Sequence, residues 1–495
     1  MNWHSTKPLE VVDRASVPVL ETDSWVVAIR EKLAEGASPV ALFGEKESAG
    51  GFRVWCILGD ASENHLFLTT ARMPERGGRF ASLARDFPAM SGFECELFEQ
   101  TGIVPEGHPW LRPVRAGGAW RGKDGAPYAF YRVEGDEVHE VAVGPVHAGV
   151  IEPGHFRFQC HGEQILHLEI GLGYQHRGVE ALLPRRNAVQ RLILVESIAG
   201  DSVIAHATAF CAGLESLAGI SLSLREHAVR GIAAELERIA MHLASLGGIA
   251  TDIGFALPAA ALGGLRTLVI NLTAALCGSR FGRGWIVPGG VRFDVDDQWL
   301  GKAKEVLGTV REKFADVKAL LFGAASALAR FEDTGIVSVE AARQIGMVGM
   351  AARASGVDRD VRIDFPYGIF RYASIGSVML ESGDAYARAE IRALEISHSI
   401  DFILEQIENL PPAKQKGAAG GVSKEALVVS MTEGHRGEIA HVLLTGANGE
   451  LSAVKIKDPS FHNWQGLAVA VRENGISDFP LCNKSFDLSY SGHDL

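Results

Sequence analysis

The stretch that decides the fold reads Gly173-Tyr174-Gln175-His176-Arg177-Gly178-Val179-Glu180. Gly178 permits a tight backbone turn, which could aim the carboxylate of Glu180 inward. Burial disfavours the charged form of a carboxylate and raises its pKa toward the range that suits proton transfer. The alternative explanation is a surface ion pair between Arg177 and Glu180, which would contribute only modestly to stability.

Turn-forming residues precede this stretch and enclose two histidines. The two segments read Gly144-Pro145-Val146-His147 and Glu152-Pro153-Gly154-His155. A β-hairpin is expected directly after them, from Phe156–Cys160 and Ile165–Ile170 joined at His161-Gly162-Glu163. The pattern therefore predicts a loop that carries histidines, then a hairpin, then the stretch that decides the fold.

Apolar periodicity and turn residues indicate an α+β fold made of two parts. We expect a small α/β domain at residues 1–120, a glycine-rich linker at 121–139, and a mainly helical domain with short β-hairpins at 140–495. Helices are predicted at Asp23–Ala34, Arg79–Asp86, Phe93–Gln100, Ala188–Leu217, Leu224–Leu246, Leu262–Leu276, Val295–Arg330 and Ala385–Glu408. Further strands are predicted at Val40–Phe43, Phe52–Leu58, Leu66–Thr70, Ala426–Met431, Gly437–Leu444 and Leu451–Ile456, and a flexible insert at Pro411–Gly421.

Composition limits the classes of function. The net charge of -12 argues against general nucleic-acid binding, because phosphate recognition needs a basic surface. The six cysteines are far apart and form no Cys-x-x-Cys pair, so neither a disulfide framework nor a four-thiolate iron–sulfur cluster is expected. The first residues lack the apolar core of a signal peptide, and no apolar run reaches the roughly 20 residues that span a bilayer. We expect a cytoplasmic protein that reaches the membrane through partner subunits.

Two further runs have the spacing of metal-binding motifs. They read Ala199-Gly200-Asp201-Ser202-Val203-Ile204-Ala205-His206 and Asp458-Pro459-Ser460-Phe461-His462-Asn463. With their surroundings they resemble the large subunit of nickel–iron hydrogenases of the membrane-bound, complex I-related type, which hold the metals with two Cys-x-x-Cys pairs. Thiolates hold such soft metals, whereas alanine has no donor and serine and asparagine offer only oxygen or amide donors. The resemblance therefore implies a scaffold without a nickel–iron centre. The four cysteine positions are occupied by Ala199, Ser202, Ser460 and Asn463.

The resemblance extends along most of the chain. The run from Gly92 to Arg112 resembles the end of the C-type subunit of NADH-quinone oxidoreductase. Later segments resemble the D-type subunit of the same enzyme and the hydrogenases of the formate-hydrogenlyase type: Ala234–Leu243, Pro288–Val291, Asp360–Arg362 and Gly437–Ile439. The chain thus looks like a fusion of the two, with the C-type subunit at residues 40–115 and the D-type subunit at residues 140–495.

The resemblance also implies a set of site residues. In related hydrogenases the glutamate matching Glu180 carries protons. In the D-type subunit the vacated metal cavity accepts a quinone headgroup, held by a loop histidine and by a tyrosine whose position falls on Gly200. Which loop histidine corresponds, His147 or His155, stays open. The candidate catalytic residues are Glu180, His155, His147 and Asp201, and the candidates for the vacated cavity are Gly200, Ser202, His206 and Ser460.

Individual residues of this set also have structural explanations. A hydrogen-bonded core histidine is the favoured role for His206. Asp201 and Asp458 could make the vacated cavity polar, although Asp458 more often caps the turn before Pro459.

The resemblance implies a peripheral-arm subunit of a membrane-bound oxidoreductase. Electrons would pass from a 4Fe–4S cluster on a small partner subunit to quinone or a similar acceptor, coupled to ion translocation. Antiporter-like and quinone-site membrane subunits would be further partners. The alternative is a non-catalytic structural and coupling subunit. An apolar channel as wide as a quinone ring would favour the first hypothesis and a filled cavity the second. The segment after Asn463 is expected to pack as part of the fold.

Overall fold

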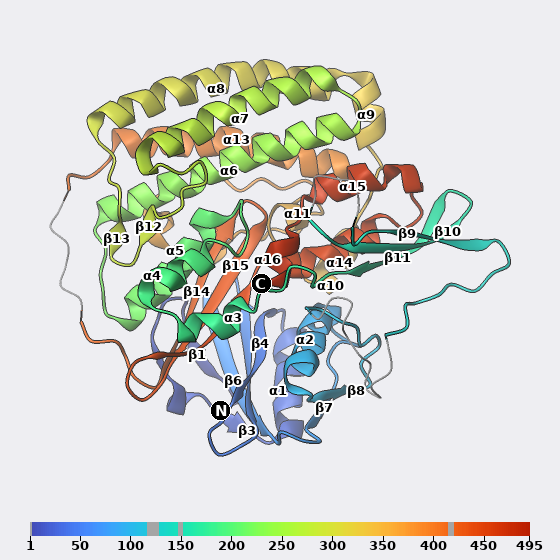
Figure 1. Cartoon of the computed structure of the whole chain (residues 1–495), viewed down its shortest axis with the longest axis vertical. Coiled ribbons are helices and arrows are strands. Elements are labelled where there is room, and N and C mark those ends of the chain that lie inside the picture. The colour runs from blue at the N-terminus through green and yellow to red at the C-terminus, as the bar shows by residue number, and fades with distance from the viewer. Residues whose placement is uncertain (1, 116–127, 147–151, 414–419) are drawn as a thin grey trace.

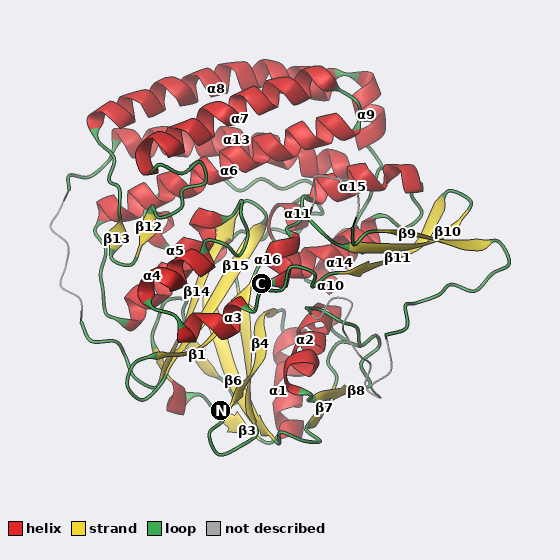
Figure 2. Ribbon diagram, in the orientation of Figure 1, coloured by secondary structure: helices red, strands yellow, loops and turns green. Residues whose placement is uncertain are grey.

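Helices and strands form separate layers of the molecule. The computed structural model describes residues 2–115, 128–146, 152–413 and 420–495. A layer of long helices lies at the top of Figure 1, and the sheets lie below it. The ribbon coloured by secondary structure shows a three-stranded sheet projecting to the right of both layers (Figure 2). This mixture of helices and strands agrees with the predicted α+β class.

Four long helices form the helical layer: α6 (Leu224–Asp252), α7 (Ala256–Cys277), α8 (Asp297–Gly323) and α13 (Ala385–Glu408). The first of them begins with a capping box, in which the side chains of Ser223 and Glu226 each accept a hydrogen bond from the other's backbone N–H. Its predicted apolar face is confirmed, because Val229, Ile232, Leu236, Ile239, Leu243 and Leu246 are all buried in the largest core cluster. These contacts, rather than propensity alone, stabilise the layer.

Helix α7 is the one described helix long and apolar enough to cross a membrane by length and composition. The sequence had predicted no such segment. Leu262, Leu265 and Val269 of this helix are buried in the core that α7 shares with α6 and α8. A core helix of this kind meets the same criteria, so the helix alone is weak evidence for a membrane segment.

The N-terminal part contains a five-stranded sheet in the order β1-β6-β5-β4, with β3 paired to β6. Helices α1 (Thr22–Ala34) and α2 (Ser91–Thr101) contribute to the same core. The strands are β1 (His4–Thr6), β3 (Val19–Leu20), β4 (Ser38–Lys46), β5 (Phe52–Asp60) and β6 (His65–Met73). The three strands and two helices predicted at these places are confirmed.

The helix predicted at Arg79–Asp86 is wrong. Its first residues form strand β7 (Arg79–Ala81), which pairs with β8 (Val104–Glu106). The following backbone is then held by a side chain, since the N–H of Leu83 donates to Oε1 of Glu94 at 2.7 Å. Local helical spacing is overridden here by partners that lie farther along the chain.

A second sheet joins distant parts of the chain. Its order is β16-β15-β14-β2, where β14 (Ala426–Gly434), β15 (Gly437–Thr445) and β16 (Leu451–Lys457) confirm three predicted strands. The fourth member, β2 (Val12–Asp13), comes from the N-terminal part and pairs with the start of β14. One core cluster likewise combines residues of both parts, including Trp55 and Leu427. The predicted linker lies partly outside the described residues, and the predicted boundary stays a prediction.

A single helix was predicted at Ala188–Leu217. The structure has two helices there, α4 (Ala188–Val195) and α5 (Val203–Leu217), so the prediction of one continuous helix is wrong. The first N–H groups of α5 donate to the side chain of Glu237 on α6 rather than to a preceding turn. The predicted helix at Val295–Arg330 is also divided, at Ala324, into α8 and α9 (Ala325–Phe331).

The segment after Asn463 packs as part of the fold, as predicted. It forms the rest of α14 (Ser460–Ala470), then α15 (Phe479–Phe486) and α16 (Tyr490–Asp494). Residues 414–419 of the predicted flexible insert lie outside the described residues. The remaining elements are β9 (Val138–Val143), β10 (His155–His161), β11 (Gln164–Gly171), α3 (Val179–Leu182), β12 (Ile286–Val287), β13 (Gly290–Val291), α10 (Val339–Gln344), α11 (Gly349–Arg353) and α12 (Val361–Asp364).

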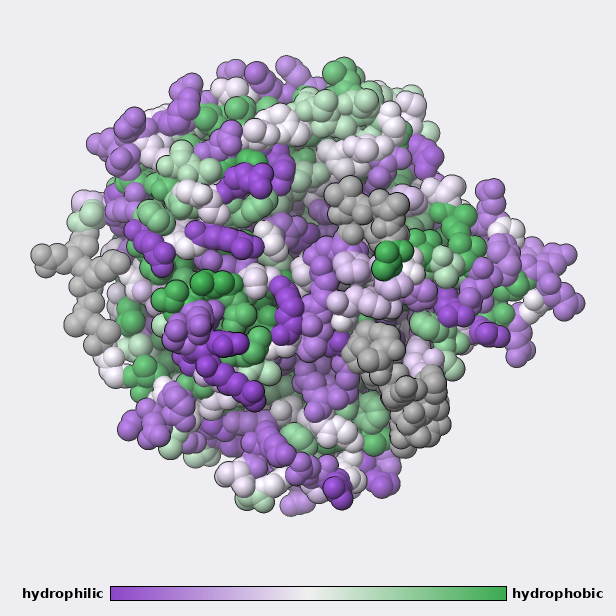
Figure 3. Space-filling view, in the orientation of Figure 1, coloured by the Kyte–Doolittle hydropathy of each residue, from purple (hydrophilic) through white to green (hydrophobic). Residues whose placement is uncertain are grey.

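Apolar side chains are exposed on α4. Val189 is 65% exposed and Ile193, one turn later, is 58% exposed. The space-filling view shows an apolar patch, ringed by hydrophilic residues, in the region where Figure 1 places α4 (Figure 3). Because both side chains lie on one face of the helix, this face is presented to the outside.

Candidate functional site

The two runs that resemble metal motifs meet in the structure. His206 lies on α5 and Asp458 lies directly after β16, and His206 Nε2 is 3.1 Å from Asp458 Oδ2. The other oxygen of Asp458 accepts a hydrogen bond from the N–H of Ser460 at 2.8 Å, which begins α14. His206 and Asp458 therefore bring the two runs together, and Asp458 also holds the turn before α14.

The four positions predicted to replace the cysteines are buried and engaged with protein. Ser202 Oγ lies 3.4 Å from His435 Nδ1, and Ser460 Oγ accepts the N–H of Ser489 at 3.0 Å. Asn463 bonds both to the N–H and to the carbonyl of Val348, each at 3.0 Å. The relative exposures are 1% for Ala199, 2% for Ser202, and 0% for Ser460 and Asn463.

This donor set does not fit a nickel–iron centre. Such a centre needs thiolates, and these four positions supply none. The amide of Asn463 and the hydroxyl of Ser460 already serve the protein backbone. Within the described ranges, no group of three or more His, Cys, Asp or Glu side chains could hold a metal ion.

Three buried side chains, His441, His206 and Asp458, form a hydrogen-bonded series at the place where the two runs meet. His206 Nδ1 lies 3.0 Å from His441 Nε2, while its other nitrogen faces Asp458. Hydrogen bonding from His206 lowers the pKa of Asp458 although burial acts in the opposite direction. An ionised Asp458 requires a proton on His206 Nε2, because a carboxylate only accepts. His441 Nδ1 has no hydrogen-bond partner among the described residues, so this series of hydrogen bonds ends in an unsatisfied nitrogen.

Asp201 forms a bidentate ion pair with Arg436. The two distances are 2.8 Å and 2.6 Å, and the Asp201 side chain is 35% exposed. Burial would raise the pKa of Asp201, but the Arg436 guanidinium outweighs it and lowers that pKa to about 2. Asp201 is therefore ionised at neutral pH and holds the turn between β14 and β15 against the first run.

Glu237 lies on α6, and its carboxyl group contacts the start of α5. Its two oxygens accept the N–H groups of Ile204 at 2.7 Å and Ala205 at 3.2 Å. Burial raises the pKa of Glu237 to about 8, although both N–H groups oppose this shift. A carboxyl group with such a pKa exchanges a proton near neutral pH, beside the run that replaces the first cysteine pair.

Glu180 joins the N-terminal part to the sheet. It accepts the N–H of Ile456 at 2.9 Å, lies 3.1 Å from the ammonium of Lys455, and is 3.4 Å from Gln100 Nε2. The surface ion pair between Arg177 and Glu180, which was the alternative explanation of this stretch, is not formed. Arg177 instead donates to the carbonyls of Ser197, Ile198 and Ser491.

His155, Glu152 and Gly200 have surroundings of their own. His155 Nδ1 is 3.2 Å from the carbonyl of Gly144. Glu152 accepts the N–H groups of Tyr490 and Ser491 at the start of α16. His147 lies outside the described residues. Gly200 occupies the break between α4 and α5, and a methyl group there would meet no atom within 4 Å.

A buried ionic network was missed by sequence reasoning. Arg353 contacts Glu395, Glu433 and Asp360, the last two at 3.1 Å and 3.4 Å. His242 lies 2.6 Å from Glu395. The other members of the network are Glu235, Arg238 and Arg362. The signal available in the sequence was the pair of charges in Asp360-Val361-Arg362 and an acid, Glu433, inside an apolar strand.

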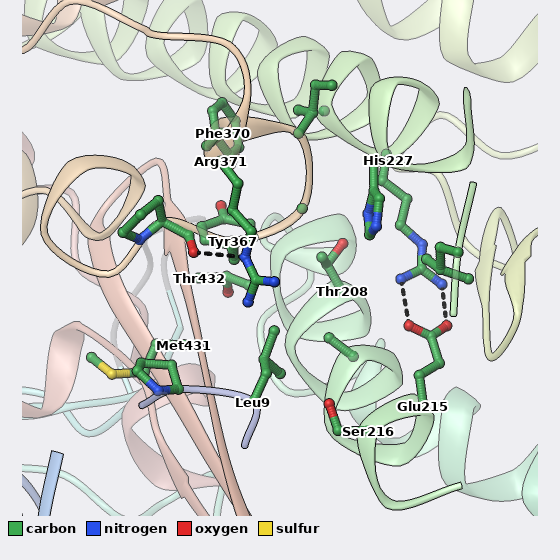
Figure 4. A pocket seen from close by; sticks show the side chains of 18 of the residues that line it. Leu9, Thr208, Glu215, Ser216, His227, Tyr367, Phe370, Arg371, Met431 and Thr432 are labelled. Carbon is green, nitrogen blue, oxygen red and sulfur yellow. Dashed lines mark hydrogen bonds and ion pairs between the residues drawn. The ribbon is translucent and has the colours of Figure 1, made fainter. Parts of the chain in front are cut away.

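A cavity of about 620 Å³ opens on another face of α5. Ala205, Thr208 and Ala212 of that helix line it, together with residues of α6, β14 and the segment 366–372. Figure 4 shows this cavity from close by. None of the predicted site residues that the structure describes lines it, although Ala205, which lines it, belongs to the first run.

Comparisons with known proteins agree with these observations. Residues 252–420 match the family described as the respiratory-chain NADH dehydrogenase 49 Kd subunit. The D-type subunit of NADH-quinone oxidoreductase from Bacillus thuringiensis subsp. konkukian is 30% identical over 347 residues, covering 68% of this chain and 93% of that protein. Formate hydrogenlyase subunit 5 of Escherichia coli strain K12 is 27% identical over 481 residues, covering 92% of this chain and 84% of that protein.

A solved structure supports the fold. A chain of the membrane-bound sulfane sulfur reductase, an archaeal respiratory membrane complex, superimposes with a TM-score of 0.68 at 21% identity. The match covers 74% of this chain and 100% of the other chain. At this level of identity the similarity concerns the architecture.

Proposed function

The chain belongs to the family that includes the D-type subunit of NADH-quinone oxidoreductase and the large subunits of membrane-bound hydrogenases, and from this membership we propose that it is a subunit of a membrane-bound, complex I-like oxidoreductase. Within such a complex it acts as a metal-free coupling subunit. The burial of Ala199, Ser202, Ser460 and Asn463, in the two runs that His206 and Asp458 join, suggests a filled site and carries this proposal.

The filled site favours coupling over electron transfer to a quinone at the same place. A quinone headgroup needs an apolar slot with a few hydrogen-bond donors. Here the replaced positions are packed against the β14–β15 turn and the C-terminal helices. Of the polar groups near these positions, Glu237 and His206 are suited to hold and pass protons rather than electrons, while Asp201 stays ionised in its pair with Arg436.

The proposal includes partner subunits. The exposed apolar face of α4, with Val189 and Ile193, directly precedes the run that replaces the first cysteine pair. We propose that this face contacts a small subunit that carries the iron–sulfur cluster. Membrane subunits of the antiporter-like and quinone-binding kinds complete the proposed complex, which lies on the inner side of the cell membrane.

Metal analysis tests the metal-free part of the proposal. The complex purified with this chain should contain no stoichiometric nickel, because the thiolates that would hold it are absent. Infrared spectra should lack bands of iron-bound carbon monoxide and cyanide. One nickel per chain, or such bands, would refute the proposal.

Replacement of Glu237 by glutamine tests the coupling role. The change removes the titrating proton beside the first run and keeps the size of the side chain. Ion translocation coupled to turnover should fall by about tenfold or more in the assembled complex, since a positioned proton carrier contributes on the order of 10². Electron transfer through the cluster of the partner subunit should continue, without the ion translocation that is otherwise coupled to it.

The control for this experiment is Glu312→Gln on the exposed side of α8. Translocation rates and assembly should both match wild type in that variant. Wild-type coupled rates in Glu237→Gln, with normal assembly, would mean that Glu237 only caps α5. The coupling proposal would then be abandoned for a purely structural role.

A further inference from the structure

The cavity beside α5 has the size and depth of a small-molecule site. Its volume of about 620 Å³ falls within the range of roughly 300–1,000 Å³ typical of ligand pockets. Helices α5 and α6 form one side, and the segment 366–372 with β14 forms another. The N-terminal residues 7–10 close the remaining side. Parts of the chain that are distant in sequence thus combine to build one enclosure.

Slightly more than half of the lining is apolar. Leu9, Ile220, Leu222, Ile369, Phe370 and Met431 contribute side chains to it. Small residues of the helices, Ala212 and Gly231, widen it on the side of α5 and α6. An apolar body of moderate size, such as a fused aromatic ring, would bury its surface against these walls.

One buried polar group inside the cavity has no partner. Thr208 is 7% exposed, and its Oγ1 has no hydrogen-bond partner among the described residues. A threonine inside a helix commonly bonds the carbonyl four residues before it. The hydroxyl of Thr208 instead lies beside the cavity, as Figure 4 shows. An unsatisfied buried hydroxyl costs about 1–3 kcal/mol, so a ligand acceptor at this place would recover that energy.

The lining of the cavity carries one positive side chain, Arg371, that no carboxylate of the lining neutralises. Glu215 is occupied by Arg230 and by the N–H of Gly289. Arg371 donates from Nε to the carbonyl of Pro366 at 3.2 Å, and its terminal nitrogens have no bond to a described residue. An anion is therefore the complement of this lining.

Two further full charges in the lining, on Lys7 and Glu10, offset each other. The carboxylate of Glu10 accepts from Thr6 Oγ1 and from the N–H of Lys7. The ammonium of Lys7 forms no ion pair within the described ranges. Burial and the nearby arginines lower the pKa of His227 to about 4, so its ring is neutral at pH 7.

The backbone at the edge of the cavity is strained. Leu9 has a φ of 68°, which is rare for a residue that bears a side chain. Its N–H donates to the carbonyl of Val429 at 2.8 Å, which holds the segment against β14. Strain of this kind gathers at ligand sites, and here it turns the side chain of Leu9 into the cavity wall.

We infer that this cavity binds a small amphipathic carboxylate. The apolar body lies between Ile369, Phe370 and Leu9, and the carboxylate accepts hydrogen bonds from Arg371 and Thr208. Its binding groups differ from His206 and Asp458, through which the metal-like runs meet, and the inference does not depend on the proposed function.

Calorimetric titration of the full chain tests the inference with 2-naphthoate and its neutral amide, 2-naphthamide. The two probes have the same ring and differ in charge. The acid should bind saturably, one per chain, and about tenfold or more tighter than the amide, because hydrogen bonds to charged groups contribute about 1.5–3 kcal/mol. Arg371→Gln should weaken the acid about tenfold and leave the amide unchanged.

Two variants locate the binding. Ala212→Leu fills the cavity and should abolish binding of both probes. Arg76→Gln, an exposed arginine in the turn after β6, is the matched control and should bind like wild type. No saturable binding of 2-naphthoate, equal affinity for acid and amide, or binding that survives Ala212→Leu would each overturn the inference.

Discussion

Replacement of Arg353 by methionine is expected to lower the free energy of unfolding by about 3–5 kcal/mol. Arg353 is fully buried and neutralises Glu395, Glu433 and Asp360. Methionine retains much of the volume but leaves these carboxylates in a low-dielectric interior with too little positive charge. The resulting penalty is that of uncompensated buried charge rather than that of a lost contact.

Urea unfolding measures this loss, followed by both fluorescence and circular dichroism. The control is Arg311→Met, which breaks the exposed pair between Arg311 and Asp401. Exposed pairs contribute about 0–1 kcal/mol, so this control should leave the unfolding midpoint nearly unchanged. A loss below about 1 kcal/mol for Arg353→Met would mean that the network is compensated by protonation of one of its acids.

Replacement of His206 by leucine should cost about 3 kcal/mol at neutral pH. Leucine fits the helix but leaves Asp458 without its histidine partner and leaves His441 without a partner at Nε2. The pKa of Asp458 is lowered in the fold, so its contribution to stability is present above its usual value of 3.8 and is lost as pH falls below it. The difference between variant and wild type should therefore shrink in acid.

A double-mutant cycle isolates this pair. Asp458→Leu alone should also destabilise, but the double variant should lose less than the sum, with a coupling of about 0.5–3 kcal/mol. His161→Leu provides the control, because His161 pairs with Glu137 at the surface. If the losses in the free energy of unfolding for His206→Leu and Asp458→Leu were strictly additive, the two side chains would contribute no interaction energy to the fold.

Local sequence patterns predicted most elements of the fold. The helix at Ala385–Glu408 has the observed bounds, and the apolar spacing of α6 identified its buried face. Two of the failures share one physical cause. The break before α5 depends on Glu237, which accepts N–H groups more than 30 residues away in sequence. The loss of the helix at Arg79–Asp86 depends similarly on Glu94.

The resemblance read from short motifs is confirmed by the family comparisons. The assignment of Ala199, Ser202, Ser460 and Asn463 to the cysteine positions rests on the spacing of the motifs and stays a prediction. What fills the site was not predictable. His435 and Arg436 come from the turn between β14 and β15, and no local pattern places that turn against α5. The roles assigned to Glu180, His155 and His147 stay predictions.

The pairing of β2 with β14 sets the order in which this chain can fold. Val12 pairs with Leu427, more than 400 residues away in sequence. At a synthesis rate of about 5–20 residues per second, the N-terminal strand waits on the order of 20–80 s for its neighbour. Contacts of such high sequence separation form slowly, because the loop must close first. The sheet whose edge strand, β16, leads into Asp458 and Ser460 thus cannot be completed until the C-terminal part of the chain has been made. Any chaperone that assists assembly therefore meets a nascent chain in which the site is still open.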